Sequence, residues 1–408
     1  MQNTLSAQLT QFTHILQQEL FPRLEPVLGP ISNRGSLFIA VCAMVPIAKL
    51  LPSGRWNGRP SKDRQSIARA FLAKSVYGFV HTRQLLEVLA NDATLRRLCG
   101  WTHASQIPHE STFSRAFAEF ANSQLPTAAH EALIRATHAT QLVGHISRGS
   151  SAISVRERFV SSPKPKLKAK TKKPKSSKKR RKAHTFGKET QAQRASRETR
   201  IERQLRAKTL EEMLQGIPTA CDIGGKKGSS GETKWWRGYK LHLDVADGNI
   251  PISALITAAS VHDSQVAIPL THRTSGRVTY LYDGMDSAYN AKAIRTASHQ
   301  QNHKPIIHFH TRPKPKTQLP SRVKLPPEWD PAEKVRYKIR TTVERGFSRM
   351  KAQRPVAAPA ATESVLRQSL RDEFLSGQIR VRGAKKVMAQ MMFGVLALTV
   401  AQLLRRHQ

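Results

Sequence analysis

Four side chains in the last quarter of the sequence could form one site on a helix. Tyr337, Arg340, Glu344 and Lys351 follow one another at intervals of three, four and seven residues. At about 100° per residue they fall within a stripe roughly 60° wide on one helix face. A carboxylate there can ligate a divalent cation while a guanidinium and an ammonium grip phosphate oxygens. The spacing predicts a metal and phosphodiester site, although the charged face of a solvated surface helix would show the same spacing.

The net charge of the chain points to a polyanionic partner. Its 408 residues include 67 Lys or Arg and 28 Asp or Glu, a formal net charge of +39. An excess of this size favours binding to polyphosphates such as nucleic acid. Cys42, Cys99 and Cys221 are scattered without a CxxC pair. They fit neither a disulfide framework nor a zinc site, which indicates a reducing compartment.

One basic segment carries nearly a third of this charge. Between Lys164 and Lys182 there are twelve Lys or Arg in nineteen residues. Such a run cannot pack a core, and self-repulsion keeps it extended. We expect it to bind DNA phosphates through counterion release, with a merely solubilising insertion as the alternative. The DNA contacts expected in it are Lys172, Lys173, Lys178, Lys179, Arg180 and Arg181.

The elements that must position these side chains fall into two regions. Residues 1–138 have apolar residues at helical spacing, which predicts an N-terminal all-α domain. Within it, a short helix, a turn and a second helix at ESTFSRAFAEFANS (110–123) are compatible with a helix-turn-helix DNA reader or with an ordinary packing module.

The region from residue 139 onward reads as a mixed α/β sheet. LVGHISRGSSAISV (142–155) has the pattern of a strand and its exit. YKLHLDVADGNIPISALITAAS (239–260) reads as two strands joined by a turn at Asp247 and Gly248. Residues 277–298 read as strand, loop and helix, and KPIIHFH (304–310) as a further strand. Strands followed by alternating strands and helices predict this class of sheet.

The apolar stretch from Val387 to Leu404 raises the question of a membrane span. It contains Gln390, Thr399 and Gln402, and basic residues flank it at both ends. Spans require about 20 predominantly apolar residues. We therefore expect a buried terminal helix and no membrane partner.

Four segments, in order along the chain, resemble the DDE transposases of bacterial insertion sequences. They are HISRGSSAISVRER, RGYKLHLDVADGNIPISALITAASVHDSQVAIPL, LYDGMDSAYNAKAI and YKIRTTVERGFSRMK. The last resembles the branch marked by Tyr, two residues, Arg, three residues, Glu, six residues and Lys, and matches it at every named position.

This resemblance implies a ribonuclease-H-like fold for residues 139–408, interrupted by the basic insertion at about 159–190. In that family three carboxylates from distant positions hold two divalent cations, Mg²⁺ or Mn²⁺, which serve an in-line displacement at phosphorus. The resemblance makes Asp286 the second carboxylate and Glu344 the third, both as metal ligands. Asp283 is the other local candidate, but Ala288 and Tyr289 match the register that starts from Asp286.

Further roles follow from the same resemblance. Tyr337, Arg340 and Lys351 would contact phosphates or the terminal bases. Trp235 and Trp236 would lie near the active site, where an exposed tryptophan could stack on an extruded base. Packing of both rings on the sheet is the alternative interpretation.

The first carboxylate of the family is missing from this chain. Family members usually read His-Ile-Ser-Arg-Asp, whereas Gly149 follows Arg148 here. Neutral serines at 150 and 151 cannot supply the charge, and its loss predicts a rate reduced roughly 10³-fold or more. Asp222 and Asp263 are surrogates by fold proximity only.

The resemblance thus implies an insertion-sequence transposase. Such an enzyme binds terminal inverted repeats and performs metal-dependent strand cleavage and strand transfer, which Gly149 would impair. The alternative is a catalytically inactive or domesticated relative that acts as a DNA-binding protein. Under either hypothesis the partner is double-stranded DNA, at the transposon ends and the target, and the location is the bacterial cytoplasm on the nucleoid. Synapsis of two ends implies a homodimer.

Overall fold

The computed structural model describes residues 31–51, 62–158, 199–227, 232–308, 330–352 and 379–406, with four isolated positions before residue 31. For residues 349–352 it describes the backbone alone. The basic segment from Lys164 to Lys182 lies outside the described residues. The DNA contacts predicted for Lys172, Lys173, Lys178, Lys179, Arg180 and Arg181 therefore stay predictions.

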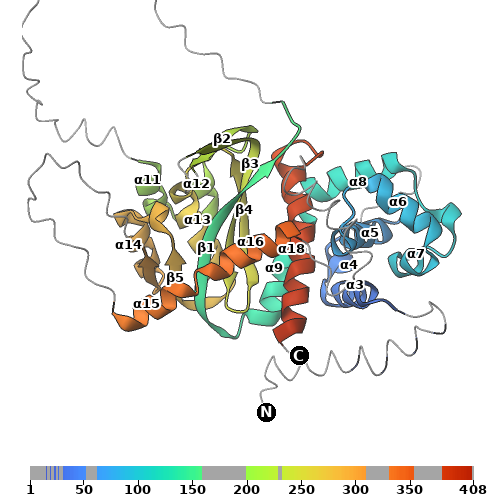
Figure 1. The fold of residues 1–408 in the computed structure, drawn as a ribbon, viewed down its shortest axis with the longest axis horizontal. Helices are drawn as coiled ribbons and strands as arrows, with labels where there is room; N and C mark the ends of the chain where they lie inside the picture. The colour runs from blue at the N-terminus through green and yellow to red at the C-terminus, as the bar shows by residue number, and fades with distance from the viewer. Residues whose placement is uncertain are drawn as a thin grey trace, which may run out of the picture.

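The N-terminal part of the described chain is helical (Figure 1). Local signals set the ends of its helices: the Asp63 side chain accepts hydrogen bonds from the first backbone N–H groups of α5, and Gly78, at φ 74°, ends that helix. Gly100, at φ 111°, ends α7 in the same way. The helices are α3 (Asn33–Met44), α4 (Ile47–Leu50), α5 (Arg64–Tyr77), α6 (Thr82–Asn91), α7 (Ala93–Cys99), η2 (Ala104–Gln106), α8 (Glu110–Asn122) and α9 (Leu125–His138).

The remainder is built on one mixed sheet, which confirms the predicted α/β class. Its strands are β1 (Leu142–Ser154), β2 (Asp222–Lys227), β3 (Thr233–Ala246), β4 (Ile250–Ala258), β5 (Thr279–Met285) and β6 (Lys304–Ile307). The order is β2-β3-β1-β5-β6, with β4 also paired to β3. β1 runs antiparallel to β3 and parallel to β5. Gly248 and Asn249, both with positive φ, form the tight turn between β3 and β4.

Helices cover both faces of this sheet (Figure 1). α13 (Ser264–Ser275) and α14 (Lys292–Gln300) lie on one face, with α11 (Arg200–Arg206) and α12 (Leu210–Leu214) packed around them. α16 (Thr341–Ala352) crosses β1 and β3 on the other face, preceded by α15 (Pro331–Lys338). α18 (Ala384–Arg406) runs between the sheet and the N-terminal helices.

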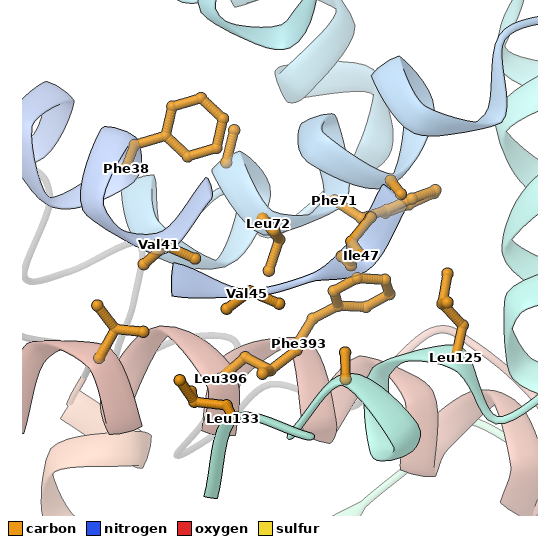
Figure 2. Close-up of a cluster of buried hydrophobic side chains, with 14 of the residues drawn as sticks. Phe38, Val41, Val45, Ile47, Phe71, Leu72, Leu125, Leu133, Phe393 and Leu396 are labelled. Carbon is orange, nitrogen blue, oxygen red and sulfur yellow. The ribbon is translucent and has the colours of Figure 1, made fainter. Parts of the chain in front are cut away.

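α18 joins the two regions into one core (Figure 2). Its Phe393 stacks on Phe71 of α5 at 5.8 Å between ring centroids, and Leu396 lies close to Leu133 of α9. The same hydrophobic cluster continues to Ile146 on β1. A separate N-terminal domain ending at residue 138 stays a prediction, because the hydrophobic core does not stop there.

The burial of α18 agrees with the predicted terminal core helix. By length and composition this helix could cross a membrane, but 72% of its most apolar 18-residue window is buried inside the protein. Partial burial of Gln390 and full burial of Thr399 and Gln402 place its polar residues in protein contacts as well. Such burial is what the core helix of a globular fold requires.

The prediction of one helix from Tyr337 to Lys351 is wrong. α15 ends at Lys338 and α16 begins at Thr341. At the junction the backbone N–H of Arg340 bonds to Tyr337 O at 3.0 Å and that of Thr342 to Ile339 O at 2.8 Å, three residues back instead of four. Ser147 Oγ on β1 donates to the same Ile339 carbonyl at 3.1 Å. This bond from another strand helps hold the break, which spacing within the helix could not reveal.

Candidate active site

Gly149 and Asp286 lie side by side where the parallel pairing between β1 and β5 ends. The register pairs Ser147 with Gly284. Two residues further along each strand, Gly149 is level with Asp286 just beyond the end of β5. In a parallel pair, side chains level with each other point to the same face. The position of the missing carboxylate therefore lies next to the carboxylate that the sequence predicts as the second ligand.

Asp283 belongs to a different, structural network on the opposite face. It is fully buried, and its carboxylate accepts hydrogen bonds from Tyr280 Oη at 3.1 Å and Ser298 Oγ at 2.7 Å. The buried guanidinium of Arg148 is 3.4 Å from it and 2.8 Å from both oxygens of Asp244. Because these partners occupy its oxygens, Asp283 is a poorer candidate ligand than Asp286.

Asp286 is half-buried at the start of a short 3₁₀ turn. Its Oδ1 accepts a hydrogen bond from the backbone N–H of Ala288 at 2.9 Å. Burial raises the pKa of the Asp286 carboxyl and the nearby charge of Asp263 adds to this, against the lowering effects of the Ala288 hydrogen bond, Arg340 and Lys226. The Asp286 carboxylate therefore lies within electrostatic reach of Asp263, Arg340 and Lys226, which come from separate parts of the chain.

Glu344 reaches the same place from α16. Its carboxylate is 60% exposed and pairs with Arg340 Nη2 at 2.8 Å. The Arg340 guanidinium lies 5.5 Å from the ring centroid of Tyr337 and within electrostatic reach of Asp286. The structure therefore brings together Tyr337, Arg340, Glu344 and Asp286 in spite of the helix break. The side chain of Lys351 lies outside the described residues, so its role stays a prediction.

The space next to Gly149 is filled by the apolar side of α16. A Cβ on Gly149 would lie 3.1 and 3.2 Å from the two methyl groups of Val343 and 3.4 Å from the ring of Phe347. Both side chains are buried. Distances this short force a neighbour to move, so α16 packs closer to β1 than a residue with a side chain at 149 would allow.

Neither surrogate aspartate takes the place of the missing one. Asp263 accepts a hydrogen bond from Ser150 Oγ at 2.8 Å and pairs with Lys240 at 3.0 Å. Ser150 alternates with Gly149 along β1, so this pair lies on the other face. Asp222 pairs with Gly238 in the middle of β3, five residues from Leu243, which pairs with Gly149, and the Asp222 carboxylate binds Ser260. Asp263 is the nearer of the two, since it lies within electrostatic reach of Asp286.

The two tryptophans have different surroundings. Trp236 lies over Gly224, and its Nε1 donates to Tyr239 O at 3.1 Å, as the sheet-packing interpretation expects. Trp235 lies over Gly225 with 70% of its surface exposed. The charge of the neighbouring Lys226 lowers the pKa of Asp286, so this end of the β2–β3 hairpin lies toward that carboxylate. Stacking of Trp235 on a base stays a prediction.

These residues do not fit a two-metal site. Within the described ranges, no group of three or more His, Cys, Asp or Glu side chains is placed to hold a metal ion. At the site itself the carboxylates are Asp286 and Glu344, and the second is already paired with Arg340. Two divalent cations need more oxygen ligands than this pair supplies.

Comparison with protein families places a known domain on each side of β1. Residues 214–354 match the Transposase DDE domain, and residues 35–119 match the Transposase domain (DUF772). Together the two matches support a DDE-type transposase. Searches of the curated proteins and of the solved structures found no match.

A DDE transposase domain implies a ribonuclease-H-like fold for the sheet, DNA as the substrate and, in general, divalent metal ions. The strand β1 that carries Gly149 lies outside both matched ranges. The match to the DUF772 domain covers α3 to α7 and most of α8. In α8, Phe113, Phe117 and Phe120 face the core, and the role of this helix in reading DNA stays a prediction.

Sequence reasoning missed Val343, Phe347 and Lys226. The first two were visible in principle, since they flank Glu344 in VERGF at a spacing of four and so predict an apolar face turned to the sheet. Lys226 gave no such signal. Its approach to Asp286 depends on the path of the β2–β3 hairpin.

Proposed function

We propose that this chain is an insertion-sequence transposase whose strand cleavage and strand transfer are impaired at Gly149. It binds the terminal inverted repeats of its element as double-stranded DNA, in the bacterial cytoplasm. Two copies bring two DNA ends together. The single observation that carries the proposal is the meeting of Asp286, Glu344 and Arg340 beside Gly149, where the parallel pairing of β1 with β5 ends.

The chemistry of these groups supports a phosphodiester ligand. Arg340 presents a guanidinium, which binds phosphate oxygens in a bidentate manner, and Tyr337 lies against it. Asp286 and Glu344 are the carboxylates at which the family resemblance predicts metal binding. With glycine at 149, the third carboxylate that would complete the site is absent.

One observation favours the alternative, a catalytically inactive relative that acts as a DNA-binding protein. The missing side chain has not left an open space, because Val343 and Phe347 fill the place that it would need. A chain maintained for cleavage would keep that place open for a carboxylate. A chain maintained for DNA binding has no such need.

A cleavage assay with four proteins separates these functions. The substrate is DNA that carries the ends of the element, incubated with Mg²⁺ or Mn²⁺. The proteins are the wild type, Gly149→Asp, Gly149→Asp with Val343→Ala, and that double variant with Glu344→Gln as the matched control. Val343→Ala removes the two closest contacts to position 149. DNA binding by fluorescence anisotropy and Mn²⁺ binding by electron paramagnetic resonance are measured on the same samples.

We expect nicking to rise about 10³-fold or more over the wild type in the Gly149→Asp, Val343→Ala variant. The added Glu344→Gln should abolish this gain while DNA binding persists. Strong nicking by the wild type would contradict the impairment and would direct the next substitution to Asp263. Silence of all four proteins with DNA binding retained would favour the alternative. Absence of DNA binding would refute both.

A further inference from the structure

A second set of cations gathers where β1 ends and α18 begins, away from the carboxylates. Val155 and Ile379 form an isolated parallel bridge. The backbone N–H of Ile379 bonds to Ser154 O at 2.9 Å, and that of Arg156 bonds to Ile379 O at 3.3 Å. The bridge makes the exposed side chains of Arg156 and Arg380 neighbours, although the two residues are 224 positions apart in the sequence (380 − 156). Figure 1 shows these ends of β1 and α18 together.

A hollow of about 540 Å³ opens beside this bridge. Four basic side chains line it, one from the chain after β1 and three from the start of α18 and the residues just before it: Arg158, Arg382, Lys385 and Lys386. Its other walls include Asn122 at the end of α8 and residues 219–221 before β2. The hollow lies at the N-terminus of a 23-residue helix, whose backbone N–H groups and dipole also favour an anion.

One carboxylate lines the hollow, and it serves the fold. Glu157 Oε2 accepts hydrogen bonds from Tyr239 Oη at 2.9 Å and from the backbone N–H of Gly383 at 2.8 Å. Glu157 therefore ties β3 to the start of α18. With Arg156 and Arg380 beside the four lining cations, six positive side chains lie around Glu157 in the described part of the chain.

The positive potential extends to the N-terminus of α6. Burial lowers the pKa of His81, and the charges of Arg380, Lys74 and Arg156 lower it further. Lys74 and Glu110 both line a second hollow, which Val381 also lines. Cations held this close repel one another, and the repulsion is relieved when a polyanion binds.

We propose that the β1–α18 basic surface, made of Arg156, Arg158, Arg380, Arg382, Lys385 and Lys386, binds the sugar-phosphate backbone of double-stranded DNA. This rests on the proposed function for the nature of the polyanion. In the sequence, the segment with twelve Lys or Arg between residues 164 and 182 begins six positions after Arg158.

The position of the surface gives a distance along the DNA. Arg156 follows Gly149 by seven residue steps, five of them within β1 and two beyond its end, which is about 23 Å of extended chain. For a duplex that lies along β1, at 3.4 Å per base pair, this is about seven base pairs. The basic surface should therefore bind phosphates roughly seven base pairs from the phosphate held at Arg340.

The test compares two triple variants of the full chain that remove the same charge. The surface variant is Arg382→Gln, Lys385→Gln, Lys386→Gln. The control is Arg203→Gln, Lys208→Gln, Lys292→Gln, three exposed cations around α11 and α14. Binding to a duplex carrying the element's end is measured by fluorescence anisotropy over a series of salt concentrations. A second surface variant, Arg156→Gln with Arg380→Gln, is used if circular dichroism shows that the triple variant is unfolded.

In the surface variant we expect the magnitude of the slope of log K against log salt concentration to fall by about 2 to 3. In the control variant we expect this slope to stay unchanged. An unchanged slope in the surface variant, with wild-type DNA binding intact, would overturn this inference and leave the proposed function standing. Absence of DNA binding in the wild type would overturn the proposed function itself. Tighter wild-type binding to phosphatidylglycerol vesicles than to the duplex, lost in the surface variant, would replace DNA by a membrane surface.

Discussion

The contact between position 149 and α16 predicts a specific energetic coupling. Gly149 has no positive φ, so alanine there meets no backbone strain, and its cost comes from Val343 and Phe347. A Cβ at 3.1 to 3.4 Å from three buried carbon atoms should overpack the interface by about 1–3 kcal/mol. Val343→Ala removes the two closest of these contacts. In that background Gly149→Ala should instead stabilise the fold by about 0.4–1 kcal/mol, because it restricts the unfolded chain.

A double-mutant cycle measures this coupling. Urea unfolding followed by far-ultraviolet circular dichroism gives the free energy of unfolding for the wild type, the two single variants and the double variant. The effect of Gly149→Ala changes from a destabilisation of about 1–3 kcal/mol to a stabilisation of about 0.4–1 kcal/mol, so we expect an interaction energy of about 1.4–4 kcal/mol between the two sites. Gly346→Ala on the same helix is the control, since its Cβ would lie at an ordinary 3.5 Å from Val245 and should stabilise the helix. Additive effects of Gly149→Ala and Val343→Ala would refute the reasoning.

Two further predictions concern buried charge. Arg148→Met should destabilise the fold by about 3–5 kcal/mol, because it leaves the buried carboxylates of Asp244 and Asp283 without their cation; a loss below 1 kcal/mol in urea unfolding would contradict this. Burial lowers the pKa of His130 to about 3 and of His242 to about 4 from 6.5. The unfolded chain then takes up protons first, so stability is complete above pH 6.5 and falls below it, by about 2 kcal/mol per histidine at pH 5. An unfolding midpoint that is the same at pH 7 and pH 5 would be inconsistent with neutral buried histidines.

The strands β1, β3, β4, β5 and β6 could be predicted from the sequence because their signals are local, whereas β2 was not predicted. Alternating or continuous apolar residues bounded by Asp247 and Gly248 define β3 and β4 without reference to the rest of the chain. The positions of Ala288 and Tyr289 in the family motif also favoured Asp286 over Asp283 as the second carboxylate. The structure gives an independent reason, because Asp283 lies on the other face of the sheet and accepts hydrogen bonds there.

What could not be predicted depends on contacts between distant segments. The break between α15 and α16 is held by Ser147, which precedes it by almost two hundred residues. The short spacing between Gly149 and Val343 likewise arises where a helix lies on a strand. Periodicity describes one element at a time, so it identifies the side chains on a face but not how closely that face is packed.

The central place of α18 has a consequence for how the chain folds during synthesis. The aromatic face of α5 and α8, with Phe71 and Phe117, is completed by Phe393 of α18. α9 ends at His138 and α18 begins at Ala384, so at 5–20 residues per second the N-terminal helices wait on the order of 12–50 s for their partner. During that time an apolar surface stays uncovered on the ribosome-bound chain. Nascent chains of this protein should therefore depend on chaperones until α18 has been synthesised, and a messenger RNA truncated before the codons of α18 should yield aggregated protein.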